Sequence, residues 1–234
     1  MSERLAAAIP AFRAAPWIAA VVRGTLSELE QVLVVDDGSD DDTAEEARRA
    51  GAEVVSLAVN RGKAEALRTA FATLFGRGCD AVVTLDADGQ HLPAEVPKLV
   101  QAHRAGADLV LGSRDHLFGG MSGLRRRSNR LSSATISFFA GARLPDVQTG
   151  FRLYTRELVE ATGFAGDRFA AESSVVVRAA RLGFRVVSVP IELGFADGRS
   201  TSHYRPLVDS LRIARAVVHA RLHPGERPRR ERVG

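Results

Sequence analysis

The sequence predicts a single α/β domain built on a doubly wound, mostly parallel sheet with helices on both faces. Short apolar, β-branched runs alternate along the chain with segments of helical length, which is typical of parallel strands joined by crossover helices. Turn-forming and acidic residues follow several of these runs directly. The length of 234 residues, 45% of them hydrophobic and 26% charged, fits one domain with a full core.

The first half of the chain contains five expected strands joined by four expected helices. The expected strands are residues 5–9, 31–35, 53–57, 81–85 and 108–112. The expected helices are residues 16–23, a segment from 43, residues 63–75 and a segment from 93. Pro16 and Pro93 suit a first helical turn. The run from Thr43 to Glu46 has the spacing of a capping box.

The second half contains fewer regular patterns. Residues 121–142 read as a helix or broken helix, in which arginines precede Ile136, Phe138 and Phe139. Apolar residues at this spacing favour core packing, with lipid contact as the alternative. Asp146 precedes a strand entry, Glu172 opens a helix over 173–182, and residues 186–191 form a last strand. Residues 205–221 read as an amphipathic helix, which could dock on the domain or lie on a bilayer. Its apolar face is Leu207, Leu211, Ala214 and Val218.

Positive charge gathers at the C-terminal end. Residues 199–234 hold nine arginines against three acids, an excess of 9 − 3 = 6, whereas residues 1–198 have 23 basic and 25 acidic side chains. Such a segment suits an anionic bilayer, a polyanion or a solvated tail. The basic segment has no zinc-ligand spacing and no aromatic interleaving, which argues against a nucleic-acid partner.

Cysteine and hydropathy patterns bear on location. Cys79 is the one cysteine in the sequence, which favours a reducing, cytoplasmic compartment and excludes a disulfide framework. Its place before an apolar strand suggests core packing. No apolar run approaches the roughly 20 residues that a spanning helix needs, so we expect a soluble or peripheral protein.

A metal site is predicted where the strand over 81–85 ends. Asp86, Asp88 and Gln90 follow it and supply the oxygen ligands that Mg²⁺ or Mn²⁺ prefers, with substrate phosphates completing the shell. The alternative is a plain turn, because Asp and Gly are ordinary turn residues.

The ends of four predicted strands meet at one edge of a parallel sheet, where open α/β sheets bind ligands. We expect Phe12 to stack on a base, and Asp36 and Asp37 to accept hydrogen bonds from base or ribose. Lys63, one of two lysines in the sequence, stands at a helix start that favours anions. The alternatives are a core phenylalanine, a turn pair and a solvated lysine. Together the strand ends predict a nucleotide site.

Five motifs in order carry a family resemblance. Residues 34–39, 60–67, 86–91, 112–114 and 149–152 resemble the family 2 glycosyltransferases of the GT-A fold, a Rossmann-like α/β fold. Their order and spacing are most similar to the polyprenyl-phosphate (dolichyl-phosphate) mannosyl- and glucosyltransferases. The resemblance covers roughly residues 5–205. It implies a GT-A domain over 1–204, with a nucleotide-sugar half over about 1–115 and an acceptor half over about 116–204. Residues 205–234 would add an amphipathic helix and basic tail.

The resemblance also implies roles for particular residues. Those implied to bind the nucleotide are Pro10, Ala11, Phe12, Asp36, Asp37, Ser39, Asn60, Lys63, Asp86 and Ala87. Those implied to bind the metal are Asp86, Asp88 and Gln90; those implied for the acceptor or its phosphate are Arg114, Arg130 and Arg199. Those implied to be catalytic are Asp88, Arg114 and Glu172. Two departures concern the donor: Arg13 replaces the usual Asn after the aromatic residue, and His203 replaces a usual Lys.

The function implied is metal-dependent, inverting transfer of a hexose from GDP-mannose or a UDP-sugar to polyprenyl phosphate, at the inner face of the membrane. A lipid phosphate is already anionic, whereas a hydroxyl acceptor needs a general base, for which Asp146 and Glu172 are the candidates. The helix dipole also explains an acid at Glu172.

The alternatives are a hydroxyl acceptor, a non-catalytic nucleotide-binding protein and a nucleotidyltransferase. The last wants a glycine-rich loop after the first strand, and residues 10–17 contain no glycine.

Overall fold

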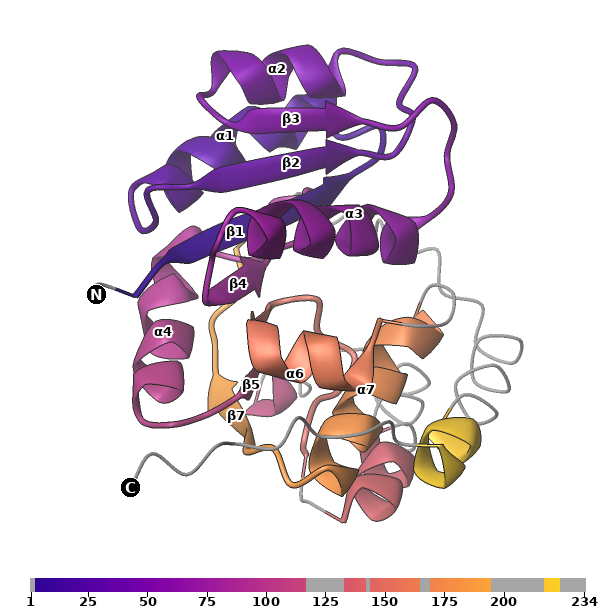
Figure 1. Cartoon of the computed structure of the whole chain (residues 1–234). Coiled ribbons are helices and arrows are strands. Elements are labelled where there is room, and N and C mark those ends of the chain that lie inside the picture. The colour runs from indigo at the N-terminus through magenta and orange to yellow at the C-terminus, as the bar shows by residue number, and fades with distance from the viewer. Residues whose placement is uncertain (1–2, 117–132, 142–143, 165–168, 195–216, 224–234) are drawn as a thin grey trace.

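The computed structural model describes residues 3–116, 133–141, 144–164, 169–194 and 217–223 (Figure 1). Within these, one seven-stranded sheet has the order β3-β2-β1-β4-β6-β5-β7. The strands are β1 Leu5–Ala11, β2 Val32–Asp36, β3 Glu53–Ser56, β4 Ala81–Thr84, β5 Leu109–Ser113, β6 Arg152–Thr155 and β7 Val186–Pro190. The predicted α/β class with a mostly parallel sheet is therefore confirmed.

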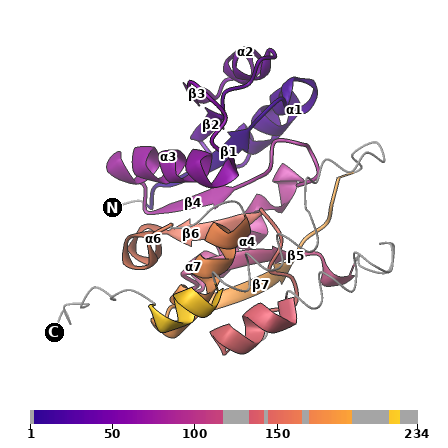
Figure 2. The ribbon, with the colours of Figure 1, turned by 90° about the vertical axis from the view of Figure 1, so that its right-hand side faces the viewer.

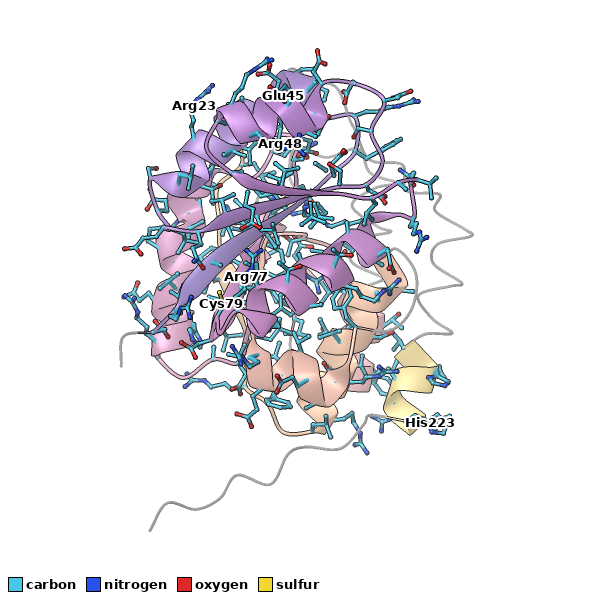
Figure 3. All side chains as sticks on the ribbon, turned by 45° about the horizontal axis from the view of Figure 1, so that its top comes forward. Arg23, Glu45, Arg48, Arg77, Cys79 and His223 are labelled. Carbon is cyan, nitrogen blue, oxygen red and sulfur yellow. The ribbon has the colours of Figure 1, made fainter. Side chains whose placement is uncertain are left out.

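Helices cover both faces of this sheet (Figures 1 and 2). One face packs against α1 Ala15–Leu26, α2 Thr43–Arg49 and α4 Val96–Arg104, which follows the 3₁₀ turn η1 Pro93–Glu95. The other packs against α3 Lys63–Gly76, α6 Arg156–Thr162, α7 Phe169–Arg181 and the helical residues 133–140 and 217–222. Alternate residues of β1 serve the two cores, since Ala6 and Ala8 face the second set and Ala7 and Ile9 the first. Charged side chains such as Arg23 and Glu45 lie on the outer side of α1 and α2 (Figure 3).

One strand departs from the expected parallel winding. β6 lies between β4 and β5 and runs antiparallel to both, pairing Leu153 with Val83 and with Val110. The other strands keep the expected common direction, because β4 and β5 both run opposite to β6 and β7 is parallel to β5. This insertion brings the loop before β6 to the carboxyl end of β4, where the predicted metal ligands begin.

Two helix starts differ from the expected ones. The last described long helix begins at Phe169, so Glu172 lies in its first turn and does not open it. The capping box at Thr43 is wrong: the helix begins at Thr43, and the side chain of the preceding Asp42 makes no capping hydrogen bond. The Thr43 hydroxyl instead accepts from the Ala14 amide at 2.7 Å and donates to Asp41, which ties α1 to α2.

The apolar side chains of the helical segment 133–140 differ in their burial. Ile136 is buried in the core, as expected, whereas the Phe138 side chain is 77% exposed and Phe139 is half-buried. Cys79 is buried, as its position suggested. No helix in the described parts of the chain has the length and apolar character to cross a bilayer.

Candidate functional site

The ends of β1 and β2 lie side by side, as the parallel pairing predicts. Ala11 pairs with Asp36, and the Ala11 carbonyl accepts from the Asp37 amide at 2.8 Å. Pro10 and Ala11 are the last residues of β1, and Phe12 follows with 43% exposure. Phe12 is therefore not a core residue, and its ring lies 5.2 Å from the Arg13 guanidinium. Arg13 itself pairs with Asp40 through two contacts of 2.7 Å.

The two predicted nucleotide carboxylates are buried and hold the surrounding loops. Asp37 accepts from the Arg61 and Gly62 amides at 2.8 and 2.6 Å, which fixes the loop that begins α3. Asp36 accepts from the Ser39 amide at 3.1 Å. Asp37 thus links the end of β2 to the loop after β3, whereas the contact of Asp36 stays within its own turn.

The same loop requires a glycine where the backbones approach. Gly38 has φ +71°, and a Cβ there would meet the Val59 carbonyl carbon at 2.6 Å and the Asn60 nitrogen at 2.7 Å. Asn60 is exposed beside this contact, and the Ser39 hydroxyl accepts from the Arg13 amide at 2.9 Å. The predicted nucleotide residues of the first three strand ends therefore lie in one group of contacting loops.

A charged cluster lies where β4 ends. The Lys63 ammonium at the start of α3 lies 2.6 Å from Asp86 Oδ1 and 3.5 Å from Glu172 Oε1. The side chains of Lys63 and Asp86 are 28% and 32% exposed, whereas Glu172 is 5% exposed. Lys63 is therefore not a solvated lysine. It joins the start of α3 to the end of β4 and to α7, which are distant in the sequence.

Lys63 and Asp86 hold each other in their charged forms. Burial alone would raise the pKa of Asp86, but the Lys63 ammonium, with help from Arg114, outweighs it and holds that pKa well below its usual range. Burial alone would lower the pKa of Lys63, but Asp86 and Glu172 outweigh it and raise that pKa. The pair thus stays ionised across the physiological range.

Gly150 completes this cluster from the loop before β6. A Cβ at Gly150 would lie 2.5 Å from Lys63 Nζ and 2.6 and 2.7 Å from the two carboxylate oxygens of Asp86. The backbone therefore approaches the ion pair as closely as only glycine allows.

His91 closes the turn that carries the predicted metal ligands. It is 2% exposed, its Nδ1 accepts from the Asp86 amide at 3.1 Å, and its ring stacks on Phe151 at 5.3 Å between centroids. Burial lowers the pKa of His91, so the ring is neutral there despite the nearby Asp86. No role was predicted for His91, although it lies in the motif over residues 86–91.

The donor set of this turn fits a divalent cation. Asp86, Asp88 and Gln90 are partly exposed at the edge of the sheet, Ala87 is buried between them, and Asp88 Oδ1 accepts from the Gln90 amide at 3.0 Å. Carboxylate and amide oxygens are hard ligands, and Mg²⁺ commonly uses one or two protein carboxylates with substrate phosphates. In the described ranges no three His, Cys, Asp or Glu side chains gather as a metal group.

A second ion pair lies after β5. Arg114 donates to the fully buried Asp146 through Nε at 2.7 Å and Nη2 at 3.3 Å, and its amide adds a contact of 3.2 Å. The Arg114 side chain is 15% exposed. Asp146 is thus committed to Arg114, which limits its use as a general base.

Arg152 was not predicted to be a functional residue, although it ends the motif over residues 149–152. Its side chain is 1% exposed and donates to the carbonyls of Thr149, Val147 and Glu172 at 2.8, 2.8 and 3.0 Å. It therefore ties the loop carrying Gly150 to the first turn of α7. The signal that could have found it is a charged residue directly before the apolar run of 153–154, because an arginine buried there must be paired.

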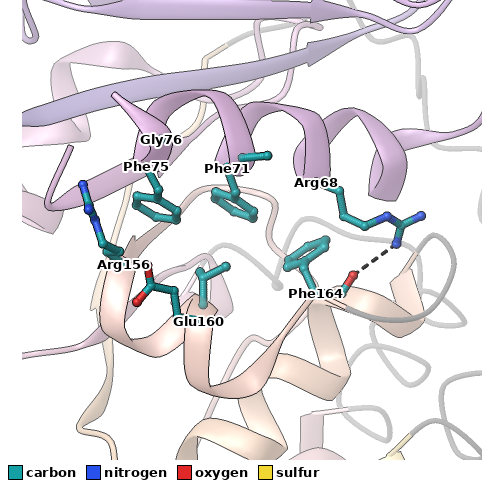
Figure 4. Close-up of a pocket in the computed structure, with 9 residues that line it drawn as sticks. Arg68, Phe71, Phe75, Gly76, Arg156, Glu160 and Phe164 are labelled. Carbon is teal, nitrogen blue, oxygen red and sulfur yellow. Dashed lines mark hydrogen bonds between the residues drawn. The ribbon is translucent and has the colours of Figure 1, made fainter. Parts of the chain in front are cut away.

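Several predicted residues fall outside the described ranges. These are Arg130, Arg199, His203 and the basic run 125–127. A separate hollow of about 600 Å³ lies between α3 and α6, lined by Phe71, Phe75 and Phe164 with Arg68 and Arg156 beside them (Figure 4). None of the predicted site residues lines it.

A doubly wound sheet with one antiparallel strand, and with carboxylates at the end of β4, is the architecture of the GT-A glycosyltransferases. The family model for glycosyl transferase family 2 matches residues 7–163. The chain therefore belongs to glycosyltransferase family 2.

The named relatives of the chain include several glycosyltransferases. The chain is 33% identical over 184 residues to the glycosyltransferase AglJ of Haloferax volcanii, covering 77% of this chain and 60% of that protein. It is 36% identical over 172 residues to an undecaprenyl-phosphate mannosyltransferase of Micrococcus luteus, covering 68% and 70%. It is 35% identical over 173 residues to a polyprenol monophosphomannose synthase of Mycolicibacterium smegmatis, covering 68% and 65%.

Solved structures share the fold across nearly the whole chain. Glucosyl-3-phosphoglycerate synthase from Mycobacterium tuberculosis, in complex with phosphoglyceric acid, has a TM-score of 0.72 and 25% identity, covering 97% of this chain and 81% of that one. The same enzyme with Mg²⁺ and uridine diphosphate has a TM-score of 0.68 and 25% identity over the same shares.

Proposed function

We propose that the protein is a metal-dependent, inverting glycosyltransferase that moves a hexose from a nucleotide sugar to polyprenyl phosphate. The observation that carries this proposal is the cluster of Lys63, Asp86 and Glu172 beside Asp88, at the carboxyl edge of a family 2 sheet. GDP-mannose and UDP-hexoses are the candidate donors. The relatives named for mannosyl transfer favour the first, and the neighbour with uridine diphosphate favours the second.

The chain's own residues position the donor. Asp37 and Gly38 fix the loops on which the base and ribose would lie, and Phe12 offers an exposed ring for stacking. Lys63 keeps Asp86 ionised and oriented, so that the turn presents Asp86, Asp88 and Gln90 together. A divalent cation bound there would stabilise the negative charge of the leaving diphosphate.

The acceptor proposal rests on the two carboxylates that were candidates for a general base. Asp146 is fully buried against Arg114, and Glu172 is 5% exposed beside Lys63. Neither is placed to take a proton from an approaching hydroxyl. A phosphate oxygen needs no deprotonation: it attacks the anomeric carbon opposite the diphosphate, which leaves with the bonding electron pair and inverts that carbon.

Arg114 keeps its predicted role as the phosphate contact in this proposal, with Arg130 and Arg199 as further candidates. It retains 15% exposure while paired with Asp146, so a phosphate could approach it. The proposal keeps the division of the chain into a nucleotide-sugar half and an acceptor half, followed by a basic tail. It also keeps peripheral attachment at the inner membrane face.

A second candidate is transfer to the hydroxyl of a small phosphorylated acid. The observation that favours it is the solved neighbour that holds phosphoglyceric acid and spans 97% of this chain. Under this alternative, Asp146 or Glu172 must leave its partner to act as the base.

The test supplies labelled GDP-mannose, UDP-glucose and UDP-N-acetylglucosamine in turn, with Mn²⁺ or Mg²⁺ and polyprenyl phosphate in detergent. We expect label in the organic-extractable lipid from one donor, and we expect Asp88→Ala to abolish it. A parallel reaction supplies phosphoglyceric acid as the acceptor, and label in that acid instead of in lipid would support the second candidate. Absence of both transfer and metal-dependent donor hydrolysis would leave a non-catalytic nucleotide-binding protein.

A further inference from the structure

Two helical segments distant in the sequence expose apolar side chains on neighbouring surfaces. Residues 133–140 expose Phe138 by 77%, and residues 217–222 expose Leu222 by 69% and Val218 by 43%. The segments touch, because Arg221 Nη1 donates to the Phe139 carbonyl at 3.0 Å and its guanidinium lies 6.0 Å from the Phe139 ring. Figures 1 and 2 both place the two segments side by side at the lower end of the molecule.

Both segments pack against the domain core, although they expose these apolar side chains. Val217 and Ala220 of the second segment and Ile136 of the first are buried in the core. Val218 and Leu222, four positions apart, share another side of their helix and point away from that core. Each segment therefore packs one side against the domain and exposes further apolar side chains on another side.

The remaining exposed side chains of the two segments are basic or neutral. His219 and His223, four positions apart, have ring centroids 4.8 Å apart, and Arg221 lies between them in the sequence. Neither 133–140 nor 217–223 contains an acidic residue. The sequence around the second segment is also basic, with nine arginines against three acids over 199–234.

We infer that this face, which comprises Phe138, Val218, His219, Arg221, Leu222 and His223, docks on an anionic lipid bilayer. The inference rests on the proposed function, whose acceptor is a membrane lipid, and it names the surface that meets the membrane. Exposed apolar side chains can enter the interfacial region, and neighbouring cations are attracted to anionic headgroups. A protein partner is the less favoured occupant, because scattered apolar residues with a single charge sign suit headgroups better than the mixed rim of a protein interface.

Vesicle co-sedimentation of the full chain without nucleotide sugar tests the inference. Vesicles of phosphatidylcholine with phosphatidylglycerol should bind the protein, and pure phosphatidylcholine should bind it more weakly. Phe138→Ser and Leu222→Ser should each weaken binding roughly threefold to tenfold, and the double variant more. Since both side chains are exposed, the variants should keep the wild-type unfolding midpoint.

A matched pair controls for the loss of an exposed apolar side chain as such. Val218→Ser removes a valine from the docking face, and Val59→Ser removes a 57% exposed valine from the loop after β3. Only the first should weaken vesicle binding. Equal effects of the two, or wild-type binding by the Phe138 and Leu222 double variant, would overturn the inference.

Two further measurements separate the other outcomes. A dimer by light scattering, dissociated by the double variant, would make this face an interface between copies of the chain and would overturn lipid docking. Sugar transfer in detergent does not require a bilayer. Transfer without vesicle binding would therefore refute this inference and leave the proposed function standing, and vesicle binding without transfer would do the reverse.

Discussion

A methyl group added at Gly150 should disturb the ion pair beside it. The added carbon would lie 2.5 Å from Lys63 Nζ and must displace the pair that Lys63 forms with Asp86. We expect Gly150→Ala to lower sugar transfer about tenfold or more, because small misplacements of a positioned group cost that much. The measurement is the transfer rate, together with urea unfolding to establish that the variant is folded.

Gly76 provides the control for that substitution. It ends α3, has no atom within 4 Å of the position of an added Cβ, and does not have a positive φ. Gly76→Ala should keep full activity and gain stability of up to about 1 kcal/mol, because alanine favours helix. If both variants were equally active, Gly150 would not be needed at the ion pair.

Tyr154 should lose its proton only in strong alkali. Burial raises the pKa of its phenol to about 12, Glu172 adds to the effect, and Arg152 opposes it. The folded chain therefore holds this proton when the unfolded chain, with a pKa near 10, has released it. By linkage, stability should fall as pH rises from about 10 towards 12.

Absorbance near 295 nm follows this titration, since tyrosinate absorbs there. The chain has two tyrosines, Tyr154 and Tyr204. Tyr204→Phe should leave one late step near pH 12, and Tyr154→Phe should remove that step. A single step near pH 10 in folded Tyr204→Phe would contradict the burial of Tyr154.

Among the elements, the junction of β6 with α7 depends on Arg152. Arg152→Gln would leave the buried carbonyls of Val147, Thr149 and Glu172 short of donors and remove a buried charge beside Glu172. We expect a loss of about 3 kcal/mol or more in the free energy of unfolding by urea denaturation. Arg49→Gln, whose arginine is 63% exposed in helical ion pairs, should cost under about 1 kcal/mol.

Activity separates positioning from mere stability. Because Arg152 holds the loop that carries Gly150, its loss should lower kcat more than it raises the KM for donor, at temperatures where the variant is folded. Arg152→Lys should recover part of the stability and less of kcat, because one ammonium cannot reach carbonyls in several directions. Wild-type kcat in folded Arg152→Gln would leave Arg152 a structural residue only.

The regular elements of the nucleotide half could be predicted from the sequence. Strands such as residues 81–84 are short runs rich in apolar and β-branched residues, and turn residues mark their ends, so the strands and the sheet edge at which they end could be predicted. β6 was harder, because Arg152–Thr155 is short, begins with a charge and gives no sign of its antiparallel direction. The capping box failed because Thr43 found tertiary partners in Ala14 and Asp41 that its local sequence cannot show.

The candidate site was predictable where chemistry follows a strand end. Asp86 and Lys63 do meet, as parallel strand ends predicted, but the sequence offered Lys63 to phosphate and the structure pairs it with carboxylates. Sequence distance hid Glu172 and Gly150 as its neighbours. Their approach depends on β6 entering the sheet, which is a property of the whole topology and not of any local pattern.

Across the whole molecule, the site brings together residues from the first strands of the sheet and residues from the segments around β5, β6 and α7. The nucleotide residues come from β1, β2 and the start of α3, whereas Gly150, Glu172 and Arg114 come from the segments around β6, α7 and β5. A donor that bridges these parts should therefore stabilise the fold as a unit.

Thermal unfolding with nucleotide tests this coupling without any turnover. A ligand at about 100 times its Kd adds about 2.7 kcal/mol, which for a domain of this size raises Tm by roughly 5 to 10 °C. We expect that rise from GDP or UDP, whichever belongs to the donor, and only when Mg²⁺ or Mn²⁺ is present. Asp88→Ala should remove the metal-dependent part and leave the Tm of the free protein nearly unchanged, because Asp88 is partly exposed. An equal rise with chelator present would place the nucleotide away from Asp88, and an equal rise from both nucleotides would mean that the base is not read by the loops at Asp37 and Phe12.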